Sequence, residues 1–185
     1  MVPGRKVRGF SLIELIVVMV ITGVLMAIAM PAFIGIIKNS RLATETNDLL
    51  ADLALARSEA ATRGRRVAIC LSSNGTSCGS GSSWGGGRIV FVDGSTAGVV
   101  DSGDTVIRYH QGGTSTNNVV ITASGFTVSS SSTLNHLQYR PSGATGSDAG
   151  GQFKICDDRT GNYGRIVVIG VTGRAALSSS NASCP

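Results

Sequence analysis

The stretch "RKVRGFSLIELIVVMVITGVLMAIAMPAFIGII", residues 5–37, decides the fold. From Leu12 to Ile37, Glu14 and Thr22 are the conspicuously polar residues of an otherwise apolar run. These 26 residues would extend about 39 Å as a helix, because each helical residue rises about 1.5 Å. A bilayer's hydrocarbon core is roughly 30 Å thick, so the sequence predicts a helix that can cross a membrane.

Basic residues flank the apolar run on its N-terminal side. Arg5, Lys6 and Arg8 precede it, and the next basic residue is Lys38. Because basic flanks stay on the cytoplasmic side, we expect a single span in the inner membrane, with a cytoplasmic N-terminus and a periplasmic C-terminal domain.

A cleaved secretory signal peptide is the alternative for the same residues. The tripeptide "AIA", residues 27–29, could serve as a small-residue cleavage site. Three features oppose this interpretation: Glu14 lies inside the apolar region, the region exceeds the usual length, and cleavage would leave a chain that begins "MPAFIGII".

Glu14 needs an explanation, because a carboxylate at the centre of a bilayer costs about 2.5 to 3.5 kcal/mol on insertion scales. A newly made α-amine would be a suitable partner, since opposite charges that are each costly in lipid offset one another when paired. The alternative is that the side chain reaches the cytoplasmic interface from its place near the start of the helix.

The residues Gly9-Phe10-Ser11-Leu12-Ile13-Glu14-Leu15 resemble the class III leader junction of type IV pilins and pseudopilins. The resemblance implies that a prepilin peptidase cuts between Gly9 and Phe10 and that Phe10 is then N-methylated. It also implies that Glu14 meets the N-terminal amine of a neighbouring subunit in the filament. Pro31 matches the family pattern as well, and it should kink the helix without ending it.

After Lys38 the helical pattern continues but becomes amphipathic. One face carries Leu42, Leu49, Leu53, Ala56 and Ala60, with neither Gly nor Pro before Gly64, which can cap the C-terminus. We therefore expect one long helix over residues 11–63 whose second half packs on a globular domain. The domain plan is a cleaved leader at 1–9, a transmembrane and filament-core helix at 10–37, an amphipathic helix at 38–66 and a β-rich domain at 67–185.

The rest of the chain reads as strands separated by Gly/Ser turns. The expected strands are "RVAICLSS", "GRIVFVDG", "TVIRYHQ", "NVVITAS", "HLQYRPSG", "GQFKICDD" and "GRIVVIGVTGRAAL". The pattern predicts an α+β fold with two small antiparallel sheets, one of them covered by the amphipathic helix. Residues 72–87 and 124–133 are expected to be linkers.

Four cysteines follow the apolar run, and an even number in an exported domain favours two disulfides over four buried thiols. The stretch "ALARSEAATRGRRVAIC", the later "GRIVFVDG" and the "YRPSG" turn resemble the GspH/FimT family of minor pilins and pseudopilins. The late cysteines are most similar to the FimU and FimT branch of that family. On this resemblance we expect the pairs Cys70–Cys78 and Cys156–Cys184.

Catalytic and metal-binding patterns are weak. Ser83 lies in a G-x-S-x-G pattern at residues 81–85, but a strand follows it where a hydrolase needs a helix. His110 and His136 lie in expected strands without metal-ligand spacing, and the Asp101–Asp104 loop is explained as well by a turn as by calcium. We therefore expect no catalytic residue, no metal and no cofactor.

DNA binding is the alternative function. Some FimT proteins bind DNA in natural transformation through a C-terminal G-R-x-R motif, and the matching place here is Gly173-Arg174-Ala175-Ala176, which lacks the second Arg. Arg159, Arg165 and Arg174 are the candidate DNA contacts. The net charge of +5 falls to +2 without the first nine residues, which carry three basic and no acidic residues. DNA is thus a partner that the sequence does not favour.

The resemblance implies an architectural protein. The expected partners are other minor and major pilins or pseudopilins, the prepilin peptidase, the inner-membrane assembly platform and, before assembly, membrane lipid. The subunit would help to initiate a type IV pilus or a type II secretion pseudopilus, near the filament tip.

Overall fold

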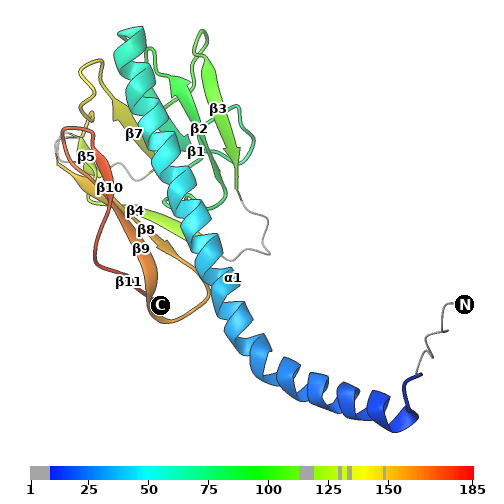
Figure 1. Ribbon diagram of the computed structural model, residues 1–185. Coiled ribbons are helices and arrows are strands. Elements are labelled where there is room, and N and C mark those ends of the chain that lie inside the picture. The colour runs from blue at the N-terminus through cyan, green and yellow to red at the C-terminus, as the bar shows by residue number, and fades with distance from the viewer. Residues whose placement is uncertain (1–8, 113–118, 129–130, 133–134, 148) are drawn as a thin grey trace, which may run out of the picture. The chain divides into compact units, whose positions relative to one another are not determined.

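The computed structural model describes residues 9–112, 119–128, 131–132, 135–147 and 149–185. The chain forms two compact units, one that ends at Asn39 and one that runs from Ser40 to Pro185. Helix α1 (Leu12–Arg63) contributes to both units. Figure 1 shows that the remaining elements are strands.

The first unit contains the apolar half of α1. Its large apolar side chains are exposed, and its length and composition suffice to cross a membrane. The hydroxyl of Thr22 donates a hydrogen bond to the Val18 carbonyl at 2.7 Å, so this polar group is satisfied within the helix. Pro31 lies inside α1 and does not end it. The kink expected there stays a prediction.

The second unit contains the amphipathic half of α1. Leu42, Leu49, Leu53, Ala56 and Ala60 are all buried, as the periodicity predicts. The helix ends at Arg63, which is the end of the helix expected over residues 11–63 and three residues before the end of the 38–66 segment in the domain plan. The reason is Gly64, whose φ of 61° places it in the left-handed region that terminates helices.

The first sheet has the strand order β3-β2-β1-β7, and neighbouring strands pair antiparallel. Its strands are β1 (Val67–Leu71), β2 (Gly87–Val92), β3 (Val106–Gln111) and β7 (His136–Tyr139). Every residue of β1 and β2 is buried, because both faces of these central strands are covered. On the face away from the main core, Phe91 packs with Ala68, Ile89 and the Cys70–Cys78 loop.

The second sheet has the order β10-β9-β8-β4, with β11 paired to β9. Its strands are β4 (Val120–Ser124), β8 (Gly151–Cys156), β9 (Gly161–Ile169), β10 (Ala175–Leu177) and β11 (Ala182–Cys184). The prediction that residues 124–133 form a linker is wrong, because this segment contains the short hairpin of β5 (Thr127–Val128) and β6 (Ser131–Ser132). Strand β11 was not predicted either, because three residues are too few to show the alternation of apolar and polar side chains that identifies a strand.

One core joins the helix to both sheets, so the expectation that α1 covers a single sheet is too narrow. The buried leucines of α1 share a cluster with Ile69 of the first sheet and Ile155 of the second. Trp84, which precedes β2, packs edge-on against Phe153 of β8, with ring centroids 4.9 Å apart. Figure 1 shows the α1 segment of this unit lying along the two sheets.

Two disulfides close the domain. Cys70 of β1 is bonded to Cys78 in the following loop, and Cys156 at the end of β8 is bonded to Cys184 of β11. These are the pairs expected from the family resemblance. The second bond attaches the C-terminal strand to the second sheet, where Ala182 pairs with Gly164 of β9.

Candidate functional site: the N-terminal assembly segment and the charged residues of the domain

The bond between Gly9 and Phe10 lies just before the first helical residue. Both residues are non-helical and exposed, and Phe10 is 84% exposed. A Cβ built on Gly9 would have no atom within 4 Å. This bond is therefore open to a protease, while residues 1–8 of the expected leader lie outside the described residues.

Ser11 precedes the first helical residue, Leu12, as the N-cap, and Glu14 lies in the first turn. The backbone N–H of Glu14 donates to the Ser11 hydroxyl at 3.3 Å and to the Ser11 carbonyl at 3.1 Å. Ser11-x-x-Glu14 also matches the capping-box pattern of a helix N-terminus. The positive end of the helix dipole favours a carboxylate at this position. Glu14 thus has a local electrostatic reason for its place, in addition to the one that the resemblance implies.

The carboxylate of Glu14 forms no ion pair within the described part of the chain. The surrounding side chains are apolar and exposed, for example Phe10 just before α1 and Leu15 within it. Any opposite charge that meets this group in lipid must therefore come from residues outside the described ranges or from another molecule.

A buried charge cluster lies between α1 and the first sheet, and the sequence analysis missed it. Asp52 and Arg88 are both fully buried, with Arg88 Nε 2.6 Å from Asp52 Oδ2. The partly exposed Arg108 brings its Nε within 3.1 Å of Asp52 Oδ1. The available signal was Asp52 itself, since an acid beside Leu49 and Leu53 interrupts the apolar face of the helix.

His110 is at the edge of this cluster. It lies opposite Arg88 in the β2–β3 register, and its ring nitrogens are 4.0 Å from Asp52 Oδ2 and from Glu45 Oε2. The arrangement attaches strand β3 to the helix and resembles no metal site. Among the described residues, no group of three His, Cys, Asp or Glu side chains could hold a metal ion.

The acidic loop before β3 uses its carboxylates internally. Asp101 accepts hydrogen bonds from the Ser95 hydroxyl and the Thr96 N–H, both at 2.8 Å, and these bonds lower its pKa. Asp104 accepts a hydrogen bond from the Asp101 N–H at 2.9 Å. The loop is therefore a hydrogen-bonded turn, as one of the two sequence interpretations predicts.

Ser83 does not occupy a nucleophile elbow. It forms a short bridge with Thr122, and the next residue, Trp84, is buried in the core. The chain then enters strand β2 at Gly87, where the hydrolase pattern needs a helix.

The three candidate DNA contacts are distributed along β9. Arg159 precedes the strand, lies 2.7 Å from an Asp157 carboxylate oxygen and stacks on the Tyr163 ring at 4.4 Å. Arg165 lies within the strand opposite Ile155. Arg174 follows the strand and is exposed beside a groove. Nine residues of strand, roughly 30 Å, separate the first arginine from the last.

Comparisons with known proteins agree with this architecture. Residues 45–173 match the family described as type II transport protein GspH, and residues 4–30 match the prokaryotic N-terminal methylation motif. A comparison with curated proteins gave no significant match.

Two crystal structures of the type IV minor pilin FimU from Pseudomonas aeruginosa are similar to this chain. Both are 22% identical to it, with TM-scores of 0.56 and 0.58. The alignments cover 77% and 79% of this chain and 99% and 96% of the FimU chains. At this identity the likeness shows a shared type IV pilin-like fold.

The apolar N-terminal helix and the methylation motif fit a pilin anchored in the inner membrane. Because the GspH match covers most of the chain, from Glu45 in the amphipathic half of α1 to Gly173 just before β10, the chain belongs to the GspH family and is a GspH/FimT-like subunit of a type IV pilus or pseudopilus.

Proposed function

We propose that this chain is a non-catalytic minor subunit that helps to initiate and assemble its filament, near the tip. Before assembly it crosses the inner membrane once, with the N-terminus in the cytoplasm and the β-rich domain in the periplasm. A prepilin peptidase cuts between Gly9 and Phe10 and methylates the new amine. Its partners are the assembly platform and other pilins or pseudopilins.

The observation that carries this proposal is the head of α1. An accessible Gly9–Phe10 bond lies immediately before a helix whose first turn holds a carboxylate with no ion-pair partner in the described chain. Cutting there creates an amine four residues from Glu14. In a bundle of such helices, the amine of one subunit can neutralise the Glu14 of its neighbour, and this pairing would set their axial register.

The test uses Glu14→Ala, Glu14→Gln and Gly9→Val in the full chain, expressed in cells that assemble the filament. We expect both Glu14 variants to insert in the membrane and to enter filaments at least tenfold less often, because the amine of a neighbour loses its partner. Gly9→Val should leave the leader attached, because a β-branched side chain does not fit where a residue without Cβ is required. Membrane fractionation, intact mass and filament yield separate these effects.

Glu59→Gln is the matched control, since Glu59 is an acid on the same helix that pairs with Arg63 at the surface. It should assemble normally. Normal incorporation of Glu14→Ala would show that the pairing hypothesis is wrong.

DNA binding is less well supported as a second function. Arg159 is committed to Asp157 and Tyr163, so Arg165 and Arg174 remain as phosphate contacts from the expected set. Two contacts give weak binding with a shallow salt dependence. A gel shift at several salt concentrations tests this, and submicromolar, steeply salt-dependent binding would favour the DNA function.

A further inference from the structure

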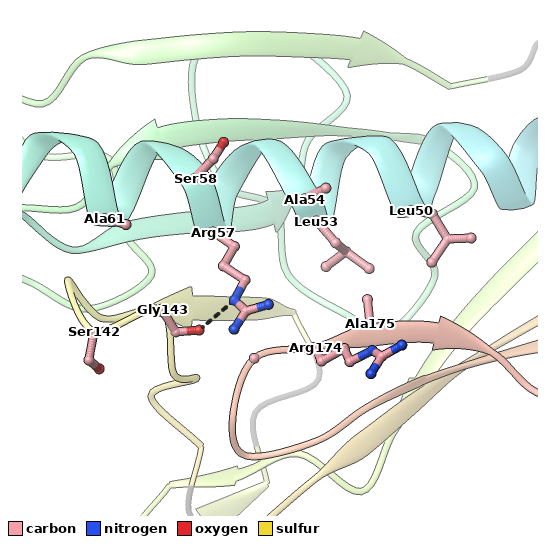
Figure 2. Close-up of a pocket in the computed structure, with 11 residues that line it drawn as sticks. Leu50, Leu53, Ala54, Arg57, Ser58, Ala61, Ser142, Gly143, Arg174 and Ala175 are labelled. Carbon is pink, nitrogen blue, oxygen red and sulfur yellow. Dashed lines mark hydrogen bonds between the residues drawn. The ribbon is translucent and has the colours of Figure 1, made fainter.

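A groove of about 690 Å³ lies between the amphipathic half of α1 and two turns of the β-rich domain. Its helical wall includes Leu50, Leu53 and Ala54. The opposite wall is the Ser142–Gly143 turn after β7 and the segment from Gly173 to Ala175 that leads into β10. Figure 2 shows Leu50, Leu53 and Arg57 pointing from α1 toward the two turns, and Ala175 pointing back toward the helix.

The charged residues of the lining are both cations, Arg57 on α1 and Arg174 on the turn before β10. No carboxylate of the described residues forms an ion pair with either of them. The groove therefore combines apolar walls with two positive charges that no carboxylate in the described part of the chain neutralises. Such a site complements a ligand that carries a carboxylate beside apolar groups.

Arg57 is held in place by the walls of the groove. Its Nε donates to the Gly143 carbonyl at 3.0 Å, and its Nη2 donates to the Thr172 carbonyl at 3.1 Å. Figure 2 shows this side chain reaching from the helix toward Gly143. These bonds use two of the five N–H groups of a guanidinium, so the rest can serve a ligand without further ordering of the side chain.

The turn of Gly173 is shaped for this contact. A Cβ on Gly173 would collide with the carbonyl oxygen of Gly143, and its φ of 81° disfavours any other residue. The close approach of the two turns presents the Gly143 and Thr172 carbonyls together to Arg57. The Gly-Arg pair at 173–174, which the DNA-binding interpretation uses, thus has a different role here: the glycine closes the wall and the arginine lines it.

We propose that this groove binds an acidic segment of another protein, with a carboxylate between Arg57 and Arg174 and apolar side chains against Leu50, Leu53 and Ala54. A peptide is favoured over DNA because most of the groove's lining residues are apolar or uncharged. Of the other two candidate phosphate contacts, Arg159 is committed to Asp157 and Tyr163, and Arg165 lies in β9 outside the groove. The groove includes no residue of the N-terminal segment. Acidic-peptide binding and the assembly role of Glu14 can therefore fail independently.

The test uses the full chain in detergent micelles, with the side-chain Nε–H signals of the arginines followed by NMR. The probe is the acetylated, amidated peptide Leu-Asp-Ala-Leu-Asp-Leu, compared with its analogue that has Asn for each Asp. We expect saturable shifts of the Arg57 and Arg174 signals, and binding of the acidic peptide about tenfold tighter than that of the analogue, since charge-assisted hydrogen bonds are the stronger ones.

Two matched pairs of variants connect the binding to the groove. Arg174→Gln should weaken binding about tenfold, whereas Arg65→Gln removes the same charge from an exposed residue outside the groove and should have no effect. Ala54→Leu should fill the groove and abolish binding. Ala51→Leu makes the same change at an exposed position of α1 outside the lining and should leave binding intact. Neither alanine is buried, so both variants keep the core.

The proposal is overturned by any of three results. These are an absence of saturable shifts with the acidic peptide, equal affinity for the Asn analogue, or displacement of the peptide by a 12-base-pair DNA duplex or inorganic phosphate at lower concentration. Loss of binding in Ala51→Leu would likewise show that the groove is not the site.

Discussion

Two of the carboxylates on helix α1 are in opposite situations. Asp52, in the globular unit, is fully buried and has Arg88 and Arg108 within 3.1 Å. Glu14, at the head of the apolar half, has no ion-pair partner in the described chain and is surrounded by exposed apolar side chains. The same chemical group therefore has an internal partner in one unit and lacks one in the other.

The difference separates folding from assembly. A buried charge with internal partners contributes to the stability of the unit that contains them, and removing one partner leaves the other charge buried and uncompensated. A charge without an internal partner does not contribute to the stability of the folded unit. We therefore expect its partner to belong to another molecule. Changes at Asp52 should therefore alter unfolding, and changes at Glu14 should alter association.

The largest expected effect is at the buried pair. Asp52→Ala should lower the free energy of unfolding of the globular unit by about 3 to 5 kcal/mol, because Arg88 stays buried without its counter-charge. Chemical denaturation of the full chain in detergent, followed through the fluorescence of the buried Trp84, measures this. Glu14→Ala should leave the same transition unchanged.

A double variant sharpens the comparison. Asp52→Leu combined with Arg88→Met removes both charges and keeps apolar volume, and it should recover most of the stability that the single variant loses. If the double variant is as unstable as Asp52→Ala, then the packing of these side chains, and not their charges, stabilises the globular unit.

The second effect concerns the two disulfides, which close loops of different length within the globular unit. The Cys156–Cys184 bond spans 28 residues and the Cys70–Cys78 bond spans 8. In the chain-entropy treatment, their removal costs about 3.6 and about 2.5 kcal/mol, respectively. Paired Cys→Ser variants under the same denaturation should follow this order.

The reverse order would indicate that packing outweighs loop entropy. Cys70 belongs to the small cluster around Phe91 and is completely buried, so its substitution also disturbs the outer face of the first sheet. Neither pair of variants should change the insertion of the apolar half of α1 in the membrane, which contains no cysteine.

The sequence predicted the helix and most strands because their patterns are local. The apolar face from Leu42 to Ala60 repeats with helical period, and Gly64 ends it. Six of the seven expected strands are present as single strands, whereas the seventh, at 164–177, is divided by a turn into the antiparallel pair β9 and β10. The hairpin of β5 and β6 was missed because strands of two residues leave no periodic signal. Strand β11 was missed because it is equally short and pairs with residues of β9 that are distant in sequence.

The residues of the candidate site also fall into those that the sequence could predict and those that it could not. The leader junction is a contiguous motif, so Gly9, Phe10 and Glu14 could be singled out from the sequence, and their roles stay predictions. The charge cluster joins Asp52 to Arg88, 36 positions later, and the groove joins Arg57 to Arg174. Which polar residues meet across a core depends on strand order and register, and neither follows from local patterns.

A smaller effect is expected from His136, a titratable group of the globular unit whose environment disfavours its charge. Burial lowers its pKa, while the negative charge of Asp93 acts in the opposite direction. The folded pKa is therefore below the unfolded value of about 6.5. As the pH falls through that value, the unfolded chain takes up the proton first, so stability is complete above it and declines below it.

The variant His136→Gln removes this titration. We expect the unfolding free energy of the wild type to fall between pH 7 and pH 5 more steeply than that of the variant. His110→Gln serves as the control for the other histidine, which lies beside Asp52 and Glu45. Parallel pH profiles for the wild type and His136→Gln would show that burial of this ring has no energetic consequence.

The smallest effect should come from a buried polar group that carries no charge. The Tyr139 hydroxyl is buried and has no hydrogen-bond partner in the described structure, and its burial raises its pKa, so it remains neutral. Tyr139→Phe should change the unfolding free energy by less than about 1 kcal/mol, and in the stabilising direction, because no hydrogen bond is lost and an unsatisfied group is removed. Tyr109→Phe, which removes a bond to the Ser73 carbonyl, should be slightly destabilising. A loss above about 1.5 kcal/mol in Tyr139→Phe would mean that an ordered water satisfies the hydroxyl.

The globular unit tolerates a buried neutral group without a partner, whereas the buried charge of Asp52 requires one. This difference is the reason to look for the partner of Glu14 outside its own chain.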